Sequence, residues 1–229
     1  MRIERATLET CGAAAGAVVV IDVLRSFTTA AFAFAAGARE ILPVGTAEDA
    51  LALRERFPAA VVAGAAPGGW PIAGFDLGNS PAALADRQLG GRQIILCTAG
   101  GAKGLVRSRG AESLLAASLV CAGATARHLL RLAPPLVTLV VTGIYHDRDG
   151  DEDIACADYI AALLRGDAPE PAEYARRARE SDFGRRFTDP HHPATPAADL
   201  ACCASVDRFD FAMPVDRRGD LLVMTALAV

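Results

Sequence analysis

The chain has 229 residues, of which 52% are hydrophobic and 22% are charged, and its formal net charge is -4. This composition excludes an intrinsically disordered chain, and the length suffices for a buried core without disulfides. The acidic balance and the absence of any basic run argue against a surface that binds nucleic acid.

The cysteines and the apolar N-terminal region both favour a cytoplasmic location. The six cysteines form no CxxC pair, so we expect them to be reduced and mostly buried. The apolar stretch 11–37 is interrupted by Asp22 and Arg25, so we do not expect it to span a membrane. The first residues lack the apolar run of a signal peptide.

The first half of the chain alternates short apolar runs with helical segments. The β-branched run at 17–21 predicts a buried strand that ends at Asp22. The Ala- and Phe-rich segment 26–36 predicts a helix closed by Gly37. The next predicted elements are a strand at 41–44, a helix at 46–57 with Thr46 as its N-cap, a strand at 60–63 and a Gly/Pro-rich loop at 64–81.

The second half continues the same alternation. The run 93–97 predicts a strand, and the Gly-containing segment 98–101 predicts a tight turn into a helix. Cys202 and Cys203 are expected in a buried strand, and His191 lies in a Pro-rich loop that predicts a surface position. The remaining predictions are strands at 114–118, 136–142 and 221–226, helices at 122–132 and 151–164, and short helices within 167–196.

Strands that alternate with helices and are apolar throughout predict an α/β fold. We expect a three-layer α/β/α arrangement around a largely parallel or mixed sheet. A single domain over residues 1–229 is preferred, and an internal division near 110–135 stays open.

Polar residues follow several of the predicted strands, where open α/β sheets bind their ligands. Asp22 is placed to hold Mg²⁺ or to act as nucleophile or base, and Arg25 with the nearby hydroxyls suits a phosphate. The alternative is that Asp22 only caps the following helix. A buried unpaired carboxylate is costly to retain, which favours the functional role.

Three further segments place polar groups at such ends. The sequence GFDLGNSP at 74–81 offers side-chain hydrogen bonds but is also an ordinary capped turn. The turn 98–104 resembles a phosphate-binding turn with Lys103 behind it, without the Walker A spacing. The acidic segment 146–153 fits a hard cation or a helix N-terminus, and in it Glu152 and Asp153 are the candidates for an inward position.

Taken together, these motifs resemble those of the 2-phosphosulfolactate phosphatases. The segments IDVLRSFTT, GFDLGNSP, the Gly-rich turn after QIILCT, the Glu152–Asp153 pair and CASVD at 203–207 follow the order and spacing of that family from about residue 18 to 215. The resemblance implies a three-layer α/β fold and Mg²⁺-dependent hydrolysis of a phosphate ester of sulfolactate, a step toward coenzyme M.

The resemblance also implies site residues, to which we assign roles from their chemistry. The expected partner is a small anionic phosphorylated substrate, with no nucleic acid and no membrane, and a homodimer stays open. The candidate residues are Asp22, Arg25 and Asp76 for catalysis, Thr28, Asn79, Ser80, Thr98, Gly100, Gly101 and Lys103 for substrate binding, and Asp22, Glu152 and Asp153 for the metal.

Two segments depart from the family pattern. Where the family has Gly-Glu-Arg, this chain has Gly64 followed by Ala65 and Ala66, and the family turn Thr-Thr-Asn-Gly-Thr is replaced by the residues at 98–102. Lys103 is expected to restore one positive charge. A catalytically silent or substrate-shifted relative that binds a small anion or a partner protein therefore stays an alternative. A haloacid-dehalogenase-type mechanism is disfavoured, because position 24 is Leu rather than the second Asp it requires.

Overall fold

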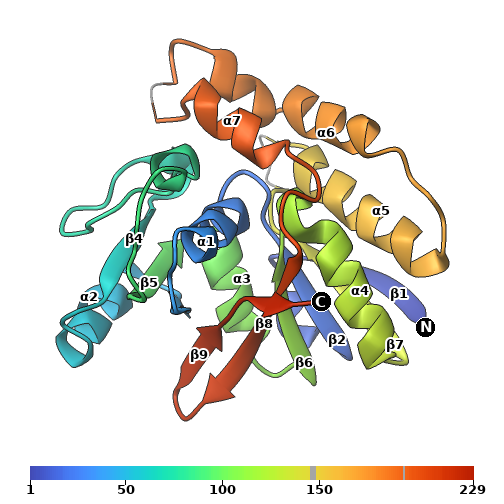
Figure 1. Cartoon of the computed structure of the whole chain (residues 1–229), viewed down its shortest axis with the longest axis horizontal. Helices are drawn as coiled ribbons and strands as arrows, with labels where there is room; N and C mark the ends of the chain where they lie inside the picture. The colour runs from blue at the N-terminus through green and yellow to red at the C-terminus, as the bar shows by residue number, and fades with distance from the viewer. Residues whose placement is uncertain (145–147, 193) are drawn as a thin grey trace.

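The computed structural model describes residues 1–144, 148–192 and 194–229 and shows a ten-stranded mixed sheet with helices on both faces (Figure 1). The strands are β1 (Arg2–Thr7), β2 (Ala17–Ile21), β3 (Glu40–Val44), β4 (Val61–Ala65), β5 (Gln93–Thr98), β6 (Ser113–Ala117), β7 (Leu136–Val141), β8 (Phe211–Arg218), β9 (Leu221–Met224) and β10 (Leu227–Ala228). The helices are α1 (Ser26–Ala35), α2 (Ala47–Arg56), α3 (Gly101–Arg107), α4 (Ala122–Leu132), α5 (Asp151–Arg165), α6 (Pro171–Glu180) and α7 (Ala197–Cys203).

Two parallel sets of strands make up the sheet, in the order β1-β7-β2-β6-β8-β9-β3-β5-β4. Strands β1, β7, β2 and β6 are parallel to one another, and so are β3, β5 and β4. The antiparallel hairpin β8–β9 joins the two sets, and β10 pairs with β8. The mixed sheet agrees with the predicted fold class.

The strands of the parallel sets other than the edge strand β1 are largely buried on both faces, which explains their mostly apolar sequences. In β2, Val18 and Val20 face the core around α1 and α3, whereas Val19 and Ile21 face the core under α4 and α5. In β5, Ile95 faces a third core against α2. The sheet is therefore covered on both sides, as an α/β/α arrangement requires.

Helix α1 lies in the middle of the molecule, between the two parallel sets (Figure 1). All of its residues from Ser26 to Phe34 are buried. A helix that is apolar all round has no face for solvent and must be enclosed. This enclosure accounts for the Ala- and Phe-rich sequence and places the N-terminal end of α1 beside the ends of β2 and β5.

The structure corrects one sequence prediction and adds elements that the apolar pattern did not indicate. Cys202 and Cys203 lie at the end of helix α7, not in a strand, because Pro196 precedes the first helical turn and the run is Ala-rich. Strands β1 and β8 were not predicted, because half-exposed edge and hairpin strands carry many polar residues. No helix within the described residues is both long and apolar enough to cross a membrane.

Candidate active site

A cavity of about 360 Å³ opens where β2, β5 and β7 end. Because these parallel strands end at neighbouring points, the residues that follow them come together from distant parts of the chain. The lining includes residues from the N-terminal segment, the loop after β4 and the start of α5. The polar residues around it are Glu9, Asp22, Arg25, Asn79, Thr98, Lys103, Arg107, Thr142, Arg148, Glu152 and Asp153.

Asp22 follows β2 directly and is buried at the base of this cavity. Its Oδ1 accepts the N–H of Ser26 at 3.0 Å, and its Oδ2 accepts the N–H of Gly101 at 2.6 Å. These donors come from the first residues of α1 and α3, so both helix N-termini are directed at one carboxylate. Asp22 therefore does cap a helix, and it also lines the cavity, while its role in metal binding or catalysis stays a prediction.

Asp153 is also held by backbone N–H groups, one of them from the residue that follows Asp22. Its Oδ1 accepts the N–H of Val23 at 2.8 Å, and its Oδ2 accepts the N–H of Thr142 at 2.9 Å. The Thr142 hydroxyl donates to the Ile21 carbonyl at 2.9 Å. Asp153 thus connects the ends of β2 and β7 to the first turn of α5.

Glu152 differs from its neighbour because one of its oxygens has no partner. The side chain is 2% exposed, and Oε2 is buried without a hydrogen bond among the described residues. A buried carboxylate oxygen with no donor is costly, which makes this oxygen a candidate to bind a cation.

Burial raises the pKa of all three carboxyls. Loss of solvation raises the pKa of Glu152 from 4.5 to about 7. Loss of solvation, followed by repulsion from Glu152 and Asp22, raises the pKa of Asp153 well above its usual range. Loss of solvation also raises the pKa of Asp22, while its N–H donors and the charges of Arg148 and Arg25 act in the opposite direction. A nearby cation would relieve this repulsion.

The donor chemistry fits a hard divalent cation, since the carboxylates of Asp22, Glu152 and Asp153 line the cavity together with the hydroxyl-bearing residues Thr98 and Thr142. Within the described residues, no group of three or more His, Cys, Asp or Glu side chains forms a metal site by itself. Mg²⁺ is usually held by one or two carboxylates together with water and substrate phosphate. Glu152 with Asp22 or Asp153 matches that requirement.

The metal-free protein is expected to lose stability as the pH rises from about 4.5 to about 7. The unfolded chain releases the Glu152 proton near its usual pKa of 4.5, whereas the folded chain keeps it until about 7. The folded state therefore binds more protons in this window, and its free energy of unfolding falls by roughly 3 kcal/mol. Mg²⁺ binds the deprotonated form, so it should raise the melting temperature more at pH 8 than at pH 5.

Thermal unfolding at both pH values, with Mg²⁺ or with a chelator, measures this effect. The Glu152→Gln variant is the matched control, because it should lose the part of the pH dependence that Glu152 contributes and keep the part that comes from Asp22 and Asp153. An equal Mg²⁺ shift at both pH values would contradict the assignment.

The Gly-rich turn before α3 approaches Asp22 closely. A Cβ on Gly100 would lie 2.8 Å from Asp22 Oδ2, and one on Gly101 would lie 2.8 Å from Ser26 Oγ. Thr98 Oγ1 shares a 2.7 Å hydrogen bond with Ser26 Oγ and accepts the N–H of Ala102 at 3.0 Å. Because Gly100 and Gly101 have no side chains, the N-terminus of α3 can approach Asp22 closely enough for an N–H group to reach its carboxylate.

Cationic side chains surround the same cavity. Arg25 is buried and pairs with Asp199, and Arg148 stacks on the Phe183 ring with its Cζ 4.6 Å from the ring centroid. Lys103 lies in the first turn of α3 and lines the cavity. The cavity therefore combines acidic and basic groups, as binding of both a cation and a phosphate requires.

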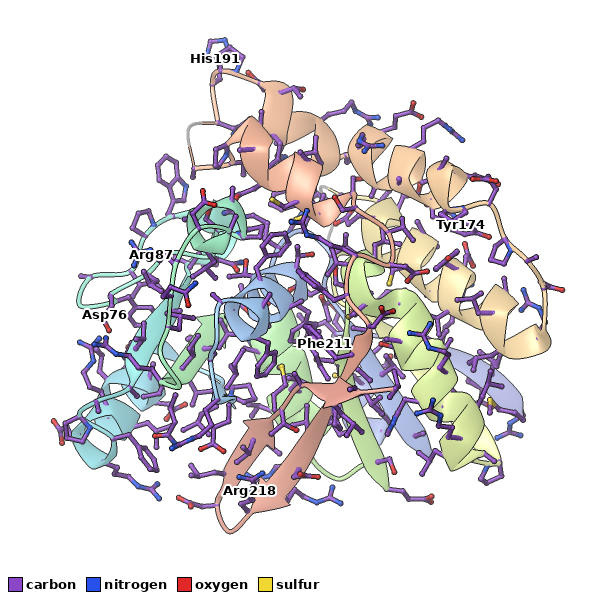
Figure 2. All side chains as sticks on the ribbon, in the orientation of Figure 1. Asp76, Arg87, Tyr174, His191, Phe211 and Arg218 are labelled. Atoms are coloured by element: carbon purple, nitrogen blue, oxygen red, sulfur yellow. The ribbon has the colours of Figure 1, made fainter. Side chains whose placement is uncertain are left out.

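Four of the residues from the family motifs do not line the cavity. Thr28 Oγ1 donates to the Val23 carbonyl at 2.8 Å, and Ser80 Oγ donates to Asp199 at 2.7 Å. Asp76 lies at the outer edge of the molecule near β4, where it pairs with Arg54 and accepts the N–H of Val62 (Figure 2). Asp207 accepts the Gly123 N–H and the Tyr159 hydroxyl. These side chains hold the fold together, and Asp76 is not in contact with the cavity proposed for catalysis.

Comparison with known proteins shows the family of the chain. A family model described as 2-phosphosulpholactate phosphatase matches residues 5–217. The chain belongs to this family. Relatives named "Probable 2-phosphosulfolactate phosphatase" include one from Bacillus subtilis, 33% identical over 204 residues that cover 89% of this chain and 88% of the relative. One from Deinococcus radiodurans is 36% identical over 82% of this chain and 80% of the relative. A third, from Carboxydothermus hydrogenoformans, is 43% identical over 65% of this chain and 60% of the relative.

The departures from the 2-phosphosulfolactate phosphatase pattern fall on the cavity wall. Ala65, at the end of β4, and Ala66 both line the cavity, at the positions where the resemblance led us to expect Glu and Arg.

The structure adds residues that the sequence did not single out for this site. Arg107 and Arg148 line the cavity, and Asp199 is buried behind Arg25. Arg107 is the last residue of α3, the helix that follows the Gly-rich turn. Its place in a helix that starts at a candidate phosphate-binding turn could have indicated a position near the site. His146 and Asp147, part of the acidic segment, lie outside the described residues. His191 is exposed at the tip of a loop, as predicted (Figure 2).

Proposed function

We propose that this member of the family is a Mg²⁺-dependent phosphoric monoester hydrolase that acts on a small hydroxy-acid phosphate. The resemblance names 2-phosphosulfolactate as the substrate, hydrolysed to sulfolactate and phosphate. The observation that carries the proposal is the juxtaposition of three buried carboxylates with Arg25 and Lys103 around one cavity. The unpartnered Oε2 of Glu152 supports it.

The chain's own residues would divide into a group that binds the phosphoryl oxygens and a group that holds the metal. Arg25 and Asn79 bind the phosphoryl oxygens, with Lys103 supplying a further positive charge. Asp22 is held by two N–H donors, so its position toward the phosphorus is fixed before substrate arrives. Bound Mg²⁺ would supply charge neutralisation at the phosphoryl group. Glu152 with Asp22 or Asp153 would hold it.

A substrate-shifted or catalytically silent relative is the second candidate. The specific observation in its favour is that Ala65 and Ala66 present methyl groups to the cavity where the family motif has Glu and Arg. A missing bidentate Arg weakens recognition of a polyanionic substrate. Such a relative would still bind a small anion, because Arg25 and Lys103 remain.

Phosphate release from a panel of phosphorylated hydroxy acids, with and without Mg²⁺, distinguishes the two candidates. We expect turnover of 2-phosphosulfolactate or a close analogue that is lost when Mg²⁺ is chelated. Turnover of a different ester indicates a shifted substrate. No turnover across the panel from folded protein that still binds inorganic phosphate supports the silent relative.

A further inference from the structure

Arg25 is held at the cavity by a carboxylate that does not reach the cavity itself. The side chains of Arg25 and Asp199 are 4% and 0% exposed, and Arg25 Nη1 donates to Asp199 Oδ2 at 2.6 Å. Arg25 lines the cavity, whereas Asp199 is not among the lining residues. Any influence of Asp199 on a ligand must therefore pass through the groups it holds.

The second oxygen of Asp199 holds the segment that follows GFDLGNSP. Oδ1 accepts the Ser80 hydroxyl at 2.7 Å and the N–H of Ala82 at 3.1 Å. Asn79, the residue before Ser80, lines the cavity. One buried carboxylate on α7 thus connects both of the groups assigned to phosphate binding, which come from the first and second motifs of the sequence.

Two further contacts leave the guanidinium a single position. The Arg25 Cζ lies 5.5 Å from the centroid of the Phe187 ring. The backbone of Gly69 is so close that a Cβ there would lie 2.5 Å from Arg25 Nη2. An arginine held on three sides loses little conformational freedom when it binds an anion, so more of the contact energy appears as affinity.

We propose that Asp199 is a positioning residue for anion binding. Its carboxylate fixes Arg25 in the geometry that meets a phosphoryl group, and through Ser80 it fixes the loop that carries Asn79. This inference rests on the proposed function, because it assumes that the ligand in the cavity is a phosphate ester.

The Asp199→Asn variant tests the proposal, with inorganic phosphate as the probe in titration calorimetry and with kcat and KM for the hydrolysed ester. We expect phosphate affinity to fall by about tenfold or more, and KM to rise with it, because the charge-assisted bond to Arg25 is lost. The control is Asp210→Asn, which removes the exposed partner of Arg127. It should leave both constants unchanged.

A double-mutant cycle separates positioning from general destabilisation. In an Arg25→Gln background, Asp199→Asn should have a clearly smaller effect on phosphate affinity, since only its action through Ser80 and the loop that carries Asn79 remains. The double variant carries a neutral Gln–Asn pair, so it leaves no buried charge without a partner. An equal loss in both backgrounds would contradict the proposal.

Circular dichroism and the melting temperature show whether each variant is folded. If Asp199→Asn does not fold, Asp199→Glu keeps the charge but shifts it by one methylene group, and unchanged phosphate affinity there counts against the proposal. If the wild-type protein binds phosphate and folded Asp199→Asn binds it equally well, the role proposed for Asp199 is wrong, but the proposed function still stands. If the wild-type protein neither binds phosphate nor hydrolyses any ester, the proposed function and the role of Asp199 both fail.

Discussion

Replacing Asp22 by Asn is expected to lower kcat for phosphate release by about 10²–10⁴-fold while the protein stays folded. Asp22 is the carboxylate at which the N-termini of α1 and α3 meet, and it lines the cavity beside Thr98 and Gly100. The amide keeps the shape of the side chain but removes the negative charge. It can therefore neither attract a cation nor accept a proton.

The stability of this variant should change far less than its activity. Asn still offers one oxygen to Ser26 or Gly101, and it removes a buried charge whose pKa burial has raised. Steady-state assays with saturating Mg²⁺ and the melting temperature measure the two effects separately. Asp167→Asn, which affects an exposed carboxylate paired with Arg165, is the matched control. Full activity of folded Asp22→Asn would remove Asp22 from the proposed site.

Replacing Gly64 by Ala is expected to destabilise the protein by roughly 4 kcal/mol or more. Gly64 lies in β4 with a φ of 148°, and a Cβ there would lie 1.9 Å from the carbonyl oxygen of Cys97 on β5. The obstacle is backbone of the neighbouring strand, so no side chain can move aside. The two strands would have to separate, which also displaces Ala65 and Ala66 from the cavity wall.

Chemical denaturation of both variants measures this difference. Gly78→Ala in the nearby GFDLGNSP segment is the control, because nothing lies within 4 Å of a Cβ at that position. We expect its free energy of unfolding to stay within about 1 kcal/mol of the wild-type value. Similar stability of the two variants would show that β4 can shift without loss, and the cavity wall would then be less rigid than the geometry indicates.

Local pattern was sufficient to predict the strands that lead into the cavity. The runs that form β2, β5 and β7 are mostly apolar, because both faces of the sheet are covered. The polar residue that ends each run then marks the edge where ligands bind. Asp22 and Thr98 were found in this way, and the structure places both at the cavity.

Motif membership did not separate residues of the cavity from residues of the framework. Asp76 and Asn79 lie in one eight-residue segment, yet Asn79 lines the cavity and Asp76 pairs with Arg54 at the outer edge of β4. Each of the two side chains makes contacts that matter, but the sequence alone does not distinguish a residue that contacts a ligand from one that contacts only the rest of the protein. The turn between them decides which side chain faces inward.

By itself, the sequence determined the α/β class, most of the strands and helices, and the positions of Asp22, Glu152 and Asp153 at element ends. These features depend on short-range periodicity and on neighbours along the chain. Only the tertiary structure decided that Asp199 meets Arg25 across 174 residues of sequence, and that Glu152 keeps an oxygen without a donor from the described part of the chain. The Arg25–Asp199 contact and the burial of the Glu152 oxygen depend on which distant segments pack together and on which atoms that packing shields from water. Neither can be predicted from the pattern of neighbouring residues along the chain.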